Sequence, residues 1–219
     1  MQKSGRILSY YIRTTWSYLQ VIIVAFIIVF GFIRPFVVEA FKIPSGSMED
    51  TLLVGDRILV CKFMYGIKVP GIKHRLFDFH KPQRGDVIVF IPPHDRKRNF
   101  IKRVVGVATD TIETRHNGRT LYVNGIPAND DNYVKHTRYM SDSLPYLPHK
   151  VPEGYLYAMG DNRDNSQDSR FWGPVDIDDV KGQAFMIYWS YDSENSRWNI
   201  LGNIRFRRLL NIIRSQKIP

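Results

Sequence analysis

The chain has 219 residues, enough for one ordinary domain with a short extra element but too few for two full-sized domains. Apolar residues make up 44% and charged residues 24% of it, which excludes an intrinsically disordered chain and a bundle of many membrane helices. The only cysteine, Cys61, excludes a disulfide framework and a cysteine-based zinc site, and we expect neither a metal nor a cofactor.

The net charge of +10 lies at the two ends of the chain. Residues 1–34 contain four basic and no acidic residues, and residues 197–219 contain six basic and no acidic residues. The residues between them carry 21 charges of each sign, so the main body is not basic and we expect no nucleic-acid partner. Both charged ends have apolar neighbours, a combination that favours a membrane surface.

The first element in the chain is an uncharged, apolar segment at residues 14–33. A helix of this length, at about 1.5 Å per residue, spans roughly 30 Å, the thickness of a bilayer's hydrocarbon core. A buried core helix and a cleaved signal peptide are the alternatives, but no small-x-small cleavage site follows the apolar run. We therefore expect one uncleaved transmembrane helix.

Basic residues on one side of this helix predict its orientation. Lys3, Arg6 and Arg13 precede it, and the positive-inside rule places them, with all of residues 1–13, in the cytoplasm. No later stretch is apolar enough to span again. Residues 34–219 are therefore expected to form one extracytoplasmic domain on the outer side of the inner (cytoplasmic) membrane.

That domain is predicted to be mostly β, as an antiparallel β-sandwich or barrel-like assembly. Short apolar runs bounded by Gly, Pro, Asn or Asp predict strands at 56–60, 86–90, 99–105, 119–124, 155–159 and 184–190. The polar residues 110–153 are typical of a small inserted lobe. Residues 203–214 mix arginines with apolar residues, which leaves a basic amphipathic helix and a solvated tail open.

Candidate chemistry begins shortly after the anchor, in the sequence Ser45-Gly46-Ser47. Gly46 permits a tight turn that exposes a hydroxyl group and aims backbone N–H groups at a nearby oxygen. A serine nucleophile needs a base, and the six histidines lie among polar residues in apparent loops, which gives no support to a histidine-based triad. A lysine can serve instead when burial lowers its pKa.

Lys102 is the lysine that interrupts an apolar strand, and its neighbour Arg103 points to the opposite face. One of these two charges must approach the interior, although a solvated lysine on an edge strand is the alternative. A third segment, residues 159–173, is dense in Asp, Asn, Arg and Ser at the end of an apolar strand. Such a loop is typical of hydrogen-bonded geometry beside a site.

Together and in this order, these segments resemble the type I signal peptidases, the membrane-bound serine proteases that remove signal peptides from exported proteins. The resemblance covers nearly the whole chain and is carried by motifs at 44–48, 55–56, 84–87, 101–106, 160–166 and 168–170. It implies a mostly β fold, exported preproteins as substrates and a lipid bilayer as partner. We expect the protein to act as a monomer.

The resemblance also implies roles for individual residues. Ser47 would be the nucleophile and Lys102 the general base, and the Ser45 hydroxyl with the Ser47 backbone N–H would form the oxyanion hole. Ser166 would orient the lysine amine. Four charged residues would hold the site together: Arg103, Asp161, Asp168 and Arg170. Apolar character and the resemblance together suggest these walls for the substrate pockets: Phe41, Ile43, Val89, Phe100 and Ile101.

One departure from the family concerns Asp50, where the family often has Pro. A carboxylate within reach of the Lys102 amine would raise its pKa, whereas a carboxylate that caps a turn would leave that pKa unchanged, and both outcomes stay open. Two other protein classes also remain as alternatives. They are a catalytically silent, membrane-tethered peptide-binding module and a DNA-associated, self-cleaving Ser/Lys regulator.

Overall fold

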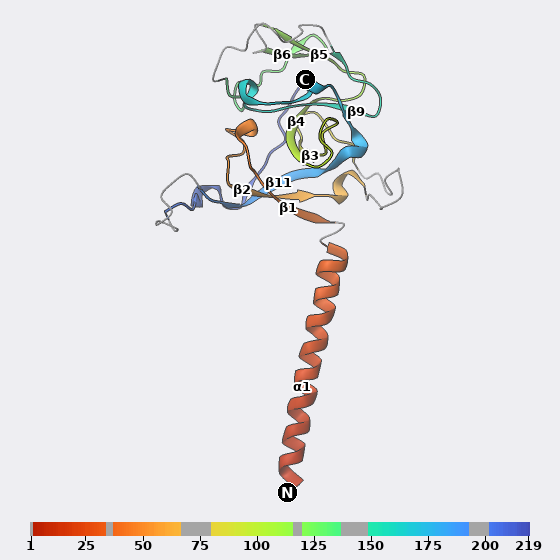
Figure 1. Cartoon of the computed structure of the whole chain (residues 1–219), viewed down its shortest axis with the longest axis vertical. Coiled ribbons are helices and arrows are strands. Elements are labelled where there is room, and N and C mark those ends of the chain that lie inside the picture. Colours follow the sequence, from red (N-terminus) through yellow and green to blue (C-terminus); the bar gives the residue numbers. More distant parts are fainter. Residues whose placement is uncertain (1, 34–36, 67–79, 116–119, 137–148, 193–201) are drawn as a thin grey trace.

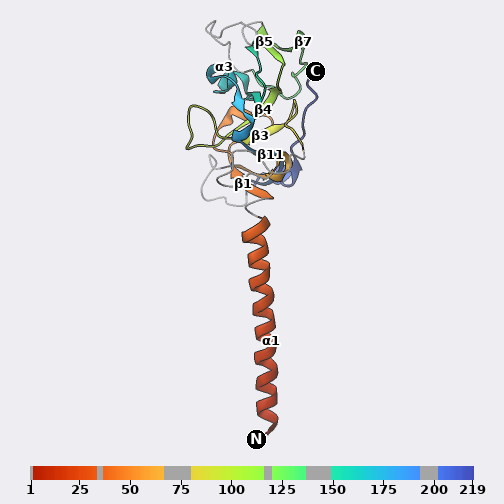
Figure 2. The same ribbon diagram turned by 90° about the vertical axis from the view of Figure 1, so that its right-hand side faces the viewer.

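The computed structural model describes residues 2–33, 37–66, 80–115, 120–136, 149–192 and 202–219. A long N-terminal helix stands apart from a β domain in both views of the chain (Figure 1 and Figure 2). Helix α1 covers Gln2–Phe26 and continues into a π-helical segment, Ile27–Ile33. Its apolar span, Arg13–Gly31, has a mean hydropathy of 1.9 and is not buried against the domain. A core helix of a globular domain would be mostly buried, so that alternative is excluded.

The domain contains two antiparallel sheets, which confirms the predicted fold class. The larger sheet has eight strands in the order β1-β2-β11-β3-β4-β9-β10, with β12 paired to β11. Their bounds are β1 Val38–Lys42, β2 Asp56–Cys61, β3 Val87–Phe90, β4 Phe100–Gly106, β9 Tyr155–Met159, β10 Val175–Asp176, β11 Val180–Ser190 and β12 Asn211–Ile212. The six predicted strands correspond to β2, β3, β4, β6, β9 and β11, with Arg119 outside the described residues.

The smaller sheet has four strands in the order β7-β6-β5-β8 and lies at the end of the domain away from α1 (Figure 1). Its strands are β5 Thr111–Arg115, β6 Thr120–Val123, β7 Ile126–Pro127 and β8 His149–Lys150. All four fall within residues 110–153, where the sequence predicts a lobe. Short helices complete the described elements: α3 Ser169–Trp172 and the 3₁₀ helices Gly46–Met48, Phe63–Tyr65, Arg163–Asn165, Ile177–Asp179 and Phe206–Arg208.

Apolar side chains pack the domain into three buried clusters. One of them joins the two sheets, because Val105 of β4 and Met159 of β9 pack with Ile112 of β5 and Leu121 of β6. Another lies beneath the segment that follows β1 and contains Met48 and Leu52, both fully buried. Each buried side chain of this size contributes roughly 1.5–3 kcal/mol relative to an exposed one. Ile101 of β4 packs against the second cluster and Val105 of β4 belongs to the first.

Residues 203–214 form neither a basic amphipathic helix nor a solvated tail, the two alternatives that the sequence leaves open. This segment contains the three-residue 3₁₀ helix Phe206–Arg208 and the strand β12. Tertiary contacts hold it against the domain: Arg208 donates to the buried Asp56 carboxylate at 2.6 Å and to the Thr51 carbonyl at 2.9 Å. Ile213 is buried in the core. These contacts outweigh the helical spacing of the apolar residues.

The last residues of the chain also pack closely on the domain. Gly85 has φ +91°, and a Cβ added there would lie 1.7 Å from the carbonyl oxygen of Gln216. The Gln216 N–H in turn donates to the Gly85 carbonyl at 3.3 Å. A residue with a side chain would fit neither this backbone conformation nor this contact, which accounts for glycine at the position.

Replacing Arg208 tests this account of the C-terminal segment. Arg208→Met should lower the free energy of unfolding by about 2–3 kcal/mol, because the buried Asp56 carboxylate loses its charged partner. The matched control is Arg207→Met, at an exposed neighbouring position, which should stay within about 0.5 kcal/mol of the parent chain. Chemical denaturation of the full chain in detergent micelles measures both. Equal effects of the two changes would contradict the assigned contact.

Candidate active site

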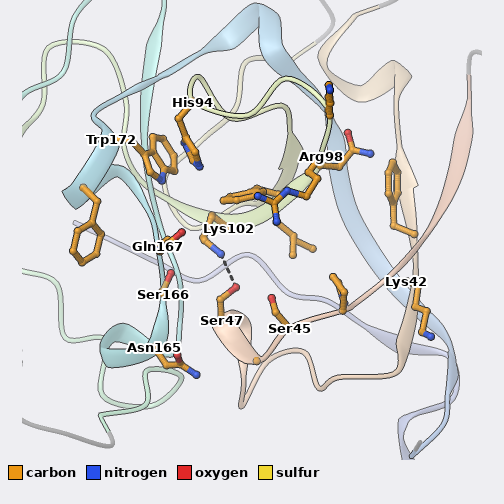
Figure 3. Close-up of a pocket in the computed structure, with 18 of the residues that line it drawn as sticks. Lys42, Ser45, Ser47, His94, Arg98, Lys102, Asn165, Ser166, Gln167 and Trp172 are labelled. Carbon is orange, nitrogen blue, oxygen red and sulfur yellow. Dashed lines mark hydrogen bonds between the residues drawn. The ribbon is translucent and has the colours of Figure 1, made fainter.

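The Ser45-Gly46-Ser47 segment lies where the chain leaves β1. Ser47 occupies the middle of the 3₁₀ helix Gly46–Met48, and Ile43 and Met48 are buried on either side of it. The first N–H groups of a helix have no intrahelical acceptor, so the Ser47 N–H is available to a ligand. Figure 3 shows the side chains of Ser45 and Ser47 on the same side of this turn, facing a cleft.

Lys102 reaches Ser47 from the neighbouring strand β4. A hydrogen bond of 2.5 Å joins Lys102 Nζ and Ser47 Oγ (Figure 3). The lysine side chain is only 3% exposed, and this burial lowers its pKa from the usual value of 10.5 to about 8, although the negative charges of Asp168 and Asp161 act in the opposite direction. With a pKa of about 8, a minor fraction of the amine is uncharged near neutral pH, and this fraction can accept a proton from the serine.

Arg103 points away from Lys102 and forms an ion pair with Asp161, both fully buried. Two hydrogen bonds of 2.9 and 2.7 Å join the guanidinium to the two carboxylate oxygens. Thr51 donates to the same carboxylate at 2.6 Å, and Arg103 donates to the Gly85 carbonyl at 2.7 Å. The sequence predicts that one of the two adjacent charges approaches the interior. In the structure both Lys102 and Arg103 are buried.

A second buried pair, Asp168 and Arg170, holds the loop that follows β9. Arg170 binds both carboxylate oxygens of Asp168 at 2.8 Å, and the Gly160 N–H donates to one of them at 3.0 Å. Burial alone raises the pKa of Asp168, but the charge and hydrogen bonds of Arg170 keep it below the usual value. Asp168 therefore remains ionised, with both carboxylate oxygens hydrogen-bonded to Arg170.

Ser166 lies beside the dyad in the cleft (Figure 3). Its hydroxyl makes no hydrogen bond to Lys102 in this structure, and it is 7% exposed. A Cβ added to Gly160 would lie 2.2 Å from Ser166 Oγ and 2.4 Å from the Ser47 carbonyl oxygen. Only glycine at position 160 allows the loop to approach Ser47 so closely, and this approach brings Ser166 beside Ser47 and Lys102.

The dyad opens into a cleft of about 1140 Å³. Of the residues that the sequence suggests as substrate-pocket walls, Phe41 of β1 and Phe100 and Ile101 of β4 line the cleft. Ile43 and Val89 do not line the cleft but are buried in the core, 1% and 2% exposed. Ile43 packs in the core with Met48, Leu52 and residues of β2, and Val89 belongs to β3, a central strand in which all four residues are buried.

Sequence reasoning missed several residues of the cleft. His94 lies in it with its ring centroid 5.4 Å from that of Phe100 and 5.7 Å from that of Trp172, and it makes no hydrogen bond to the dyad. Three exposed cations also line the cleft: Lys42, Lys97 and Arg98. No local pattern marks these residues, because strand pairing alone brings the β3–β4 connection beside α3. Thr51 and Asn162 could have been found, since each lies in or next to a predicted motif.

Asp50 lies outside this cleft. It lines a separate cavity of about 320 Å³ together with Tyr133 and Arg214. It is not among the charges that shift the pKa of Lys102, and within the described residues its carboxylate caps no backbone N–H. Its φ of +83° is closed to proline, whose ring holds φ near −65°, so proline would not fit this backbone conformation.

Within the described residues, no group of three or more His, Cys, Asp or Glu side chains is arranged to hold a metal ion. The cleft presents a hydroxyl group held against a buried amine, with backbone N–H groups beside it.

Comparison with known proteins identifies the family. A family model described as signal peptidase, peptidase S26, matches residues 15–189. The chain belongs to the type I signal peptidases. A signal peptidase I from Pseudomonas fluorescens is 38% identical over 73% of this chain and 67% of its own length. One from Buchnera aphidicola subsp. Acyrthosiphon pisum is 30% identical over 93% of this chain and 82% of its own length.

A solved structure of a signal peptidase I from Enterococcus faecalis V583 also matches, at 32% identity, over 48% of this chain and 97% of that chain, with a TM-score of 0.39. As a type I signal peptidase the chain is a serine peptidase, a hydrolase of peptide bonds.

The burial of Lys102 predicts a stability cost that depends on pH. Below about pH 8 the lysine is protonated in both the folded and the unfolded signal peptidase, and the folded state bears the full cost of the buried charge. Lys102→Met should therefore raise the free energy of unfolding at pH 7 by about 3 kcal/mol. The gain should shrink as the pH rises from about 8 towards the usual lysine value of 10.5. Denaturant titrations at several pH values measure it, and a loss of stability at pH 7 would contradict the assignment.

Proposed function

We propose that this protein removes N-terminal signal peptides from exported preproteins with a Ser47/Lys102 dyad and an acyl-enzyme intermediate. The observation that carries the proposal is the 2.5 Å hydrogen bond between Ser47 Oγ and a buried amine whose pKa is about 8. The names of the relatives, signal peptidase I, support the same substrate class. An assembled dyad argues against a catalytically silent peptide-binding module, and nothing specific favours a DNA-associated regulator.

In the first half of the reaction the Lys102 amine takes the proton of Ser47 as Oγ bonds to the scissile carbonyl carbon. The negative charge moves to the carbonyl oxygen, where the Ser45 hydroxyl and the Ser47 N–H donate to it. Each such donor contributes roughly 2.7–4 kcal/mol to stabilising the transition state. The C–N bond then breaks, the Lys102 ammonium gives its proton to the leaving amine, and the signal peptide remains as an ester on Ser47.

In the second half a water molecule replaces the leaving amine. Lys102 takes a proton from the water as its oxygen bonds to the ester carbonyl, and the same donors hold the oxyanion. The Ser47 ester bond breaks and Ser47 recovers its proton from Lys102. Ser166 is placed beside the amine and is assigned the task of orienting it, while the Arg103–Asp161 and Asp168–Arg170 pairs keep the strand and loop in place.

Two free strand edges suit an extended substrate. Strand β9 pairs with β4 only from Arg103 onward, which leaves the outer edge of residues 100–102 open. Among the described strands, β1 pairs with β2 alone, so its other edge is open to these strands as well. Both edges border the cleft, and a peptide between them would bind as an added strand whose alternate side chains meet the walls. The family resemblance implies small residues at the first and third positions before the cut.

The exposed apolar span Arg13–Gly31 supports a membrane anchor. Lys3, Arg6 and Arg13 place its N-terminal end in the cytoplasm and the β domain outside. Strand β1, which borders the cleft, begins only a few residues after the helical segment ends at Ile33. The cleft is thereby held close to the membrane surface from which a signal peptide emerges.

Removal of either member of the dyad should stop the reaction. Ser47→Ala and Lys102→Met should each reduce cleavage of a purified preprotein by at least about 10³-fold, and the double variant should lose little more, because the two groups act as one unit. In the parent protein kcat/KM should fall as the pH drops below about 8, where the amine takes up a proton.

Histidine supplies the control for that experiment. His94→Phe keeps a ring between Phe100 and Trp172 but removes the imidazole, so the acid limb of the kcat/KM profile should not move. A shifted limb in this variant, or substantial cleavage by Lys102→Met, would overturn the assignment of the lysine as base.

Topology can be tested with a membrane-impermeant maleimide on spheroplasts. Arg207→Cys, at an exposed position in the β domain, should be labelled in intact spheroplasts, whereas Lys3→Cys should be labelled only after lysis. The parent chain is the background control, because its only cysteine, Cys61, is buried. The reverse labelling pattern would place the active site on the cytoplasmic side and rule out the proposed orientation.

A further inference from the structure

Asn162 forms hydrogen bonds to the turn that contains Ser47. It is 2% exposed and follows the strand β9, far from Ser47 in the sequence. Its backbone N–H donates to the Ser47 carbonyl at 3.1 Å. Its side-chain Nδ2 donates to the Gly46 carbonyl at 3.0 Å and to a Glu49 carboxylate oxygen at 3.2 Å. Three hydrogen bonds therefore join one residue to three residues of the turn: Gly46, Ser47 and Glu49.

The bond to Gly46 matters because of peptide geometry. The Gly46 carbonyl and the Ser47 N–H belong to the same peptide group, and none of the described peptide bonds is cis. In a trans peptide group the C=O and N–H bonds point in opposite directions in one plane. A donor that holds the Gly46 oxygen on one side thus sets the direction of the Ser47 N–H on the other.

The same carbonyl accepts a second hydrogen bond, from the Glu49 N–H at 3.1 Å. Two donors on one carbonyl oxygen polarise the peptide group, and hydrogen bonds in such a chain strengthen one another. The Ser47 N–H is consequently both aimed and made a stronger donor by the groups behind it.

We propose that Asn162 is a positioning residue that orients the Gly46–Ser47 peptide group so that the Ser47 N–H meets the oxyanion. The inference rests on the proposed function, in which Ser47 is the nucleophile. Asn162 transfers no proton and makes no hydrogen bond to Lys102. Its side chain acts on the transition state through the peptide group.

Packing alone does not account for this side chain. The turn is already held by buried Met48 and Leu52 and by the hydrogen bond from the Leu52 N–H to the Met48 carbonyl at 2.7 Å. The Asn162 Oδ1 is buried without a hydrogen-bond partner, and such an atom costs stability. An apolar side chain of the same size would avoid that cost, so the useful part of the amide is the Nδ2 donor.

The test compares the full chain in detergent micelles with its Asn162→Leu variant, which keeps the volume but removes the donor. We expect kcat for a preprotein to fall about 10- to 100-fold, less than or similar to the loss of a whole oxyanion donor, with KM within about twofold. The acid limb of the kcat/KM profile should stay where it is in the parent. Glu49→Gln is the matched control, because it alters the second acceptor of Nδ2 and leaves Gly46 untouched.

Two inhibitors separate positioning from a general structural effect. A substrate-sequence peptide aldehyde forms a tetrahedral adduct with Ser47, and its inhibition constant should rise by the same factor as kcat falls. An inert peptide of the same sequence forms no oxyanion, so its constant should not change. The ratio of the two constants does not depend on how much of the sample is folded. If Asn162→Leu fails to fold, Asn162→Ser is measured in the same way.

An unchanged ratio, or an equal loss in Glu49→Gln, overturns the inference. Ser47→Ala, measured in parallel, separates this failure from failure of the proposed function. If the Ser47→Ala variant still cleaves the preprotein, Ser47 is not the nucleophile and the proposed function itself fails. If Ser47→Ala is inactive but the Asn162 variants keep the kcat and the aldehyde affinity of the parent, only the role assigned to Asn162 fails.

Discussion

The hydrogen bond between Lys102 and Ser47 depends on two nearby carboxylates that are each held by an arginine. Asp161 and Asp168 both act to raise the pKa of Lys102, while burial lowers it and the positive charge of Arg170 lowers it further. Arg103 binds Asp161 through two hydrogen bonds, and Arg170 binds Asp168 in the same way. With both carboxylates paired, burial prevails and the pKa of the lysine beside Ser47 falls to about 8.

The lobe contributes to this arrangement through the loop after β9. The Lys135 N–H donates to the Asp161 carbonyl at 2.8 Å, and the Arg163 N–H donates to the Lys135 carbonyl at 3.0 Å. Arg163 also forms a buried ion pair with Asp130 at 2.5 Å. Breaking a buried pair of this kind costs about 3–5 kcal/mol, so the segment that includes residues 130–135 secures the loop that carries Asp161, Ser166 and Asp168.

Much of the fold and of the site could be predicted because the signals are local. Alternating apolar runs located β2, β4 and β9, and the order of the motifs pointed to Ser47, Lys102 and Asp161, which the structure brings together. The errors share one cause. The segment 203–214 has helical spacing but is held by Arg208 on Asp56, and Ile43 and Val89 are apolar but covered by other strands. Spacing and apolarity do not report which partner covers a residue.

The sequence by itself determined the apolar helix, the antiparallel β class and the residue types of the site, since chain-local physics governs hydrophobic length, strand alternation and turn chemistry. Only the tertiary structure decided which carboxylate meets which arginine, that His94 enters the cleft without touching the dyad, and that Asp50 lies outside it. It also decided that Asn162 holds the Gly46 carbonyl. These features depend on distances of a few ångströms between residues far apart in the chain, which packing of the sheets sets and no local pattern encodes.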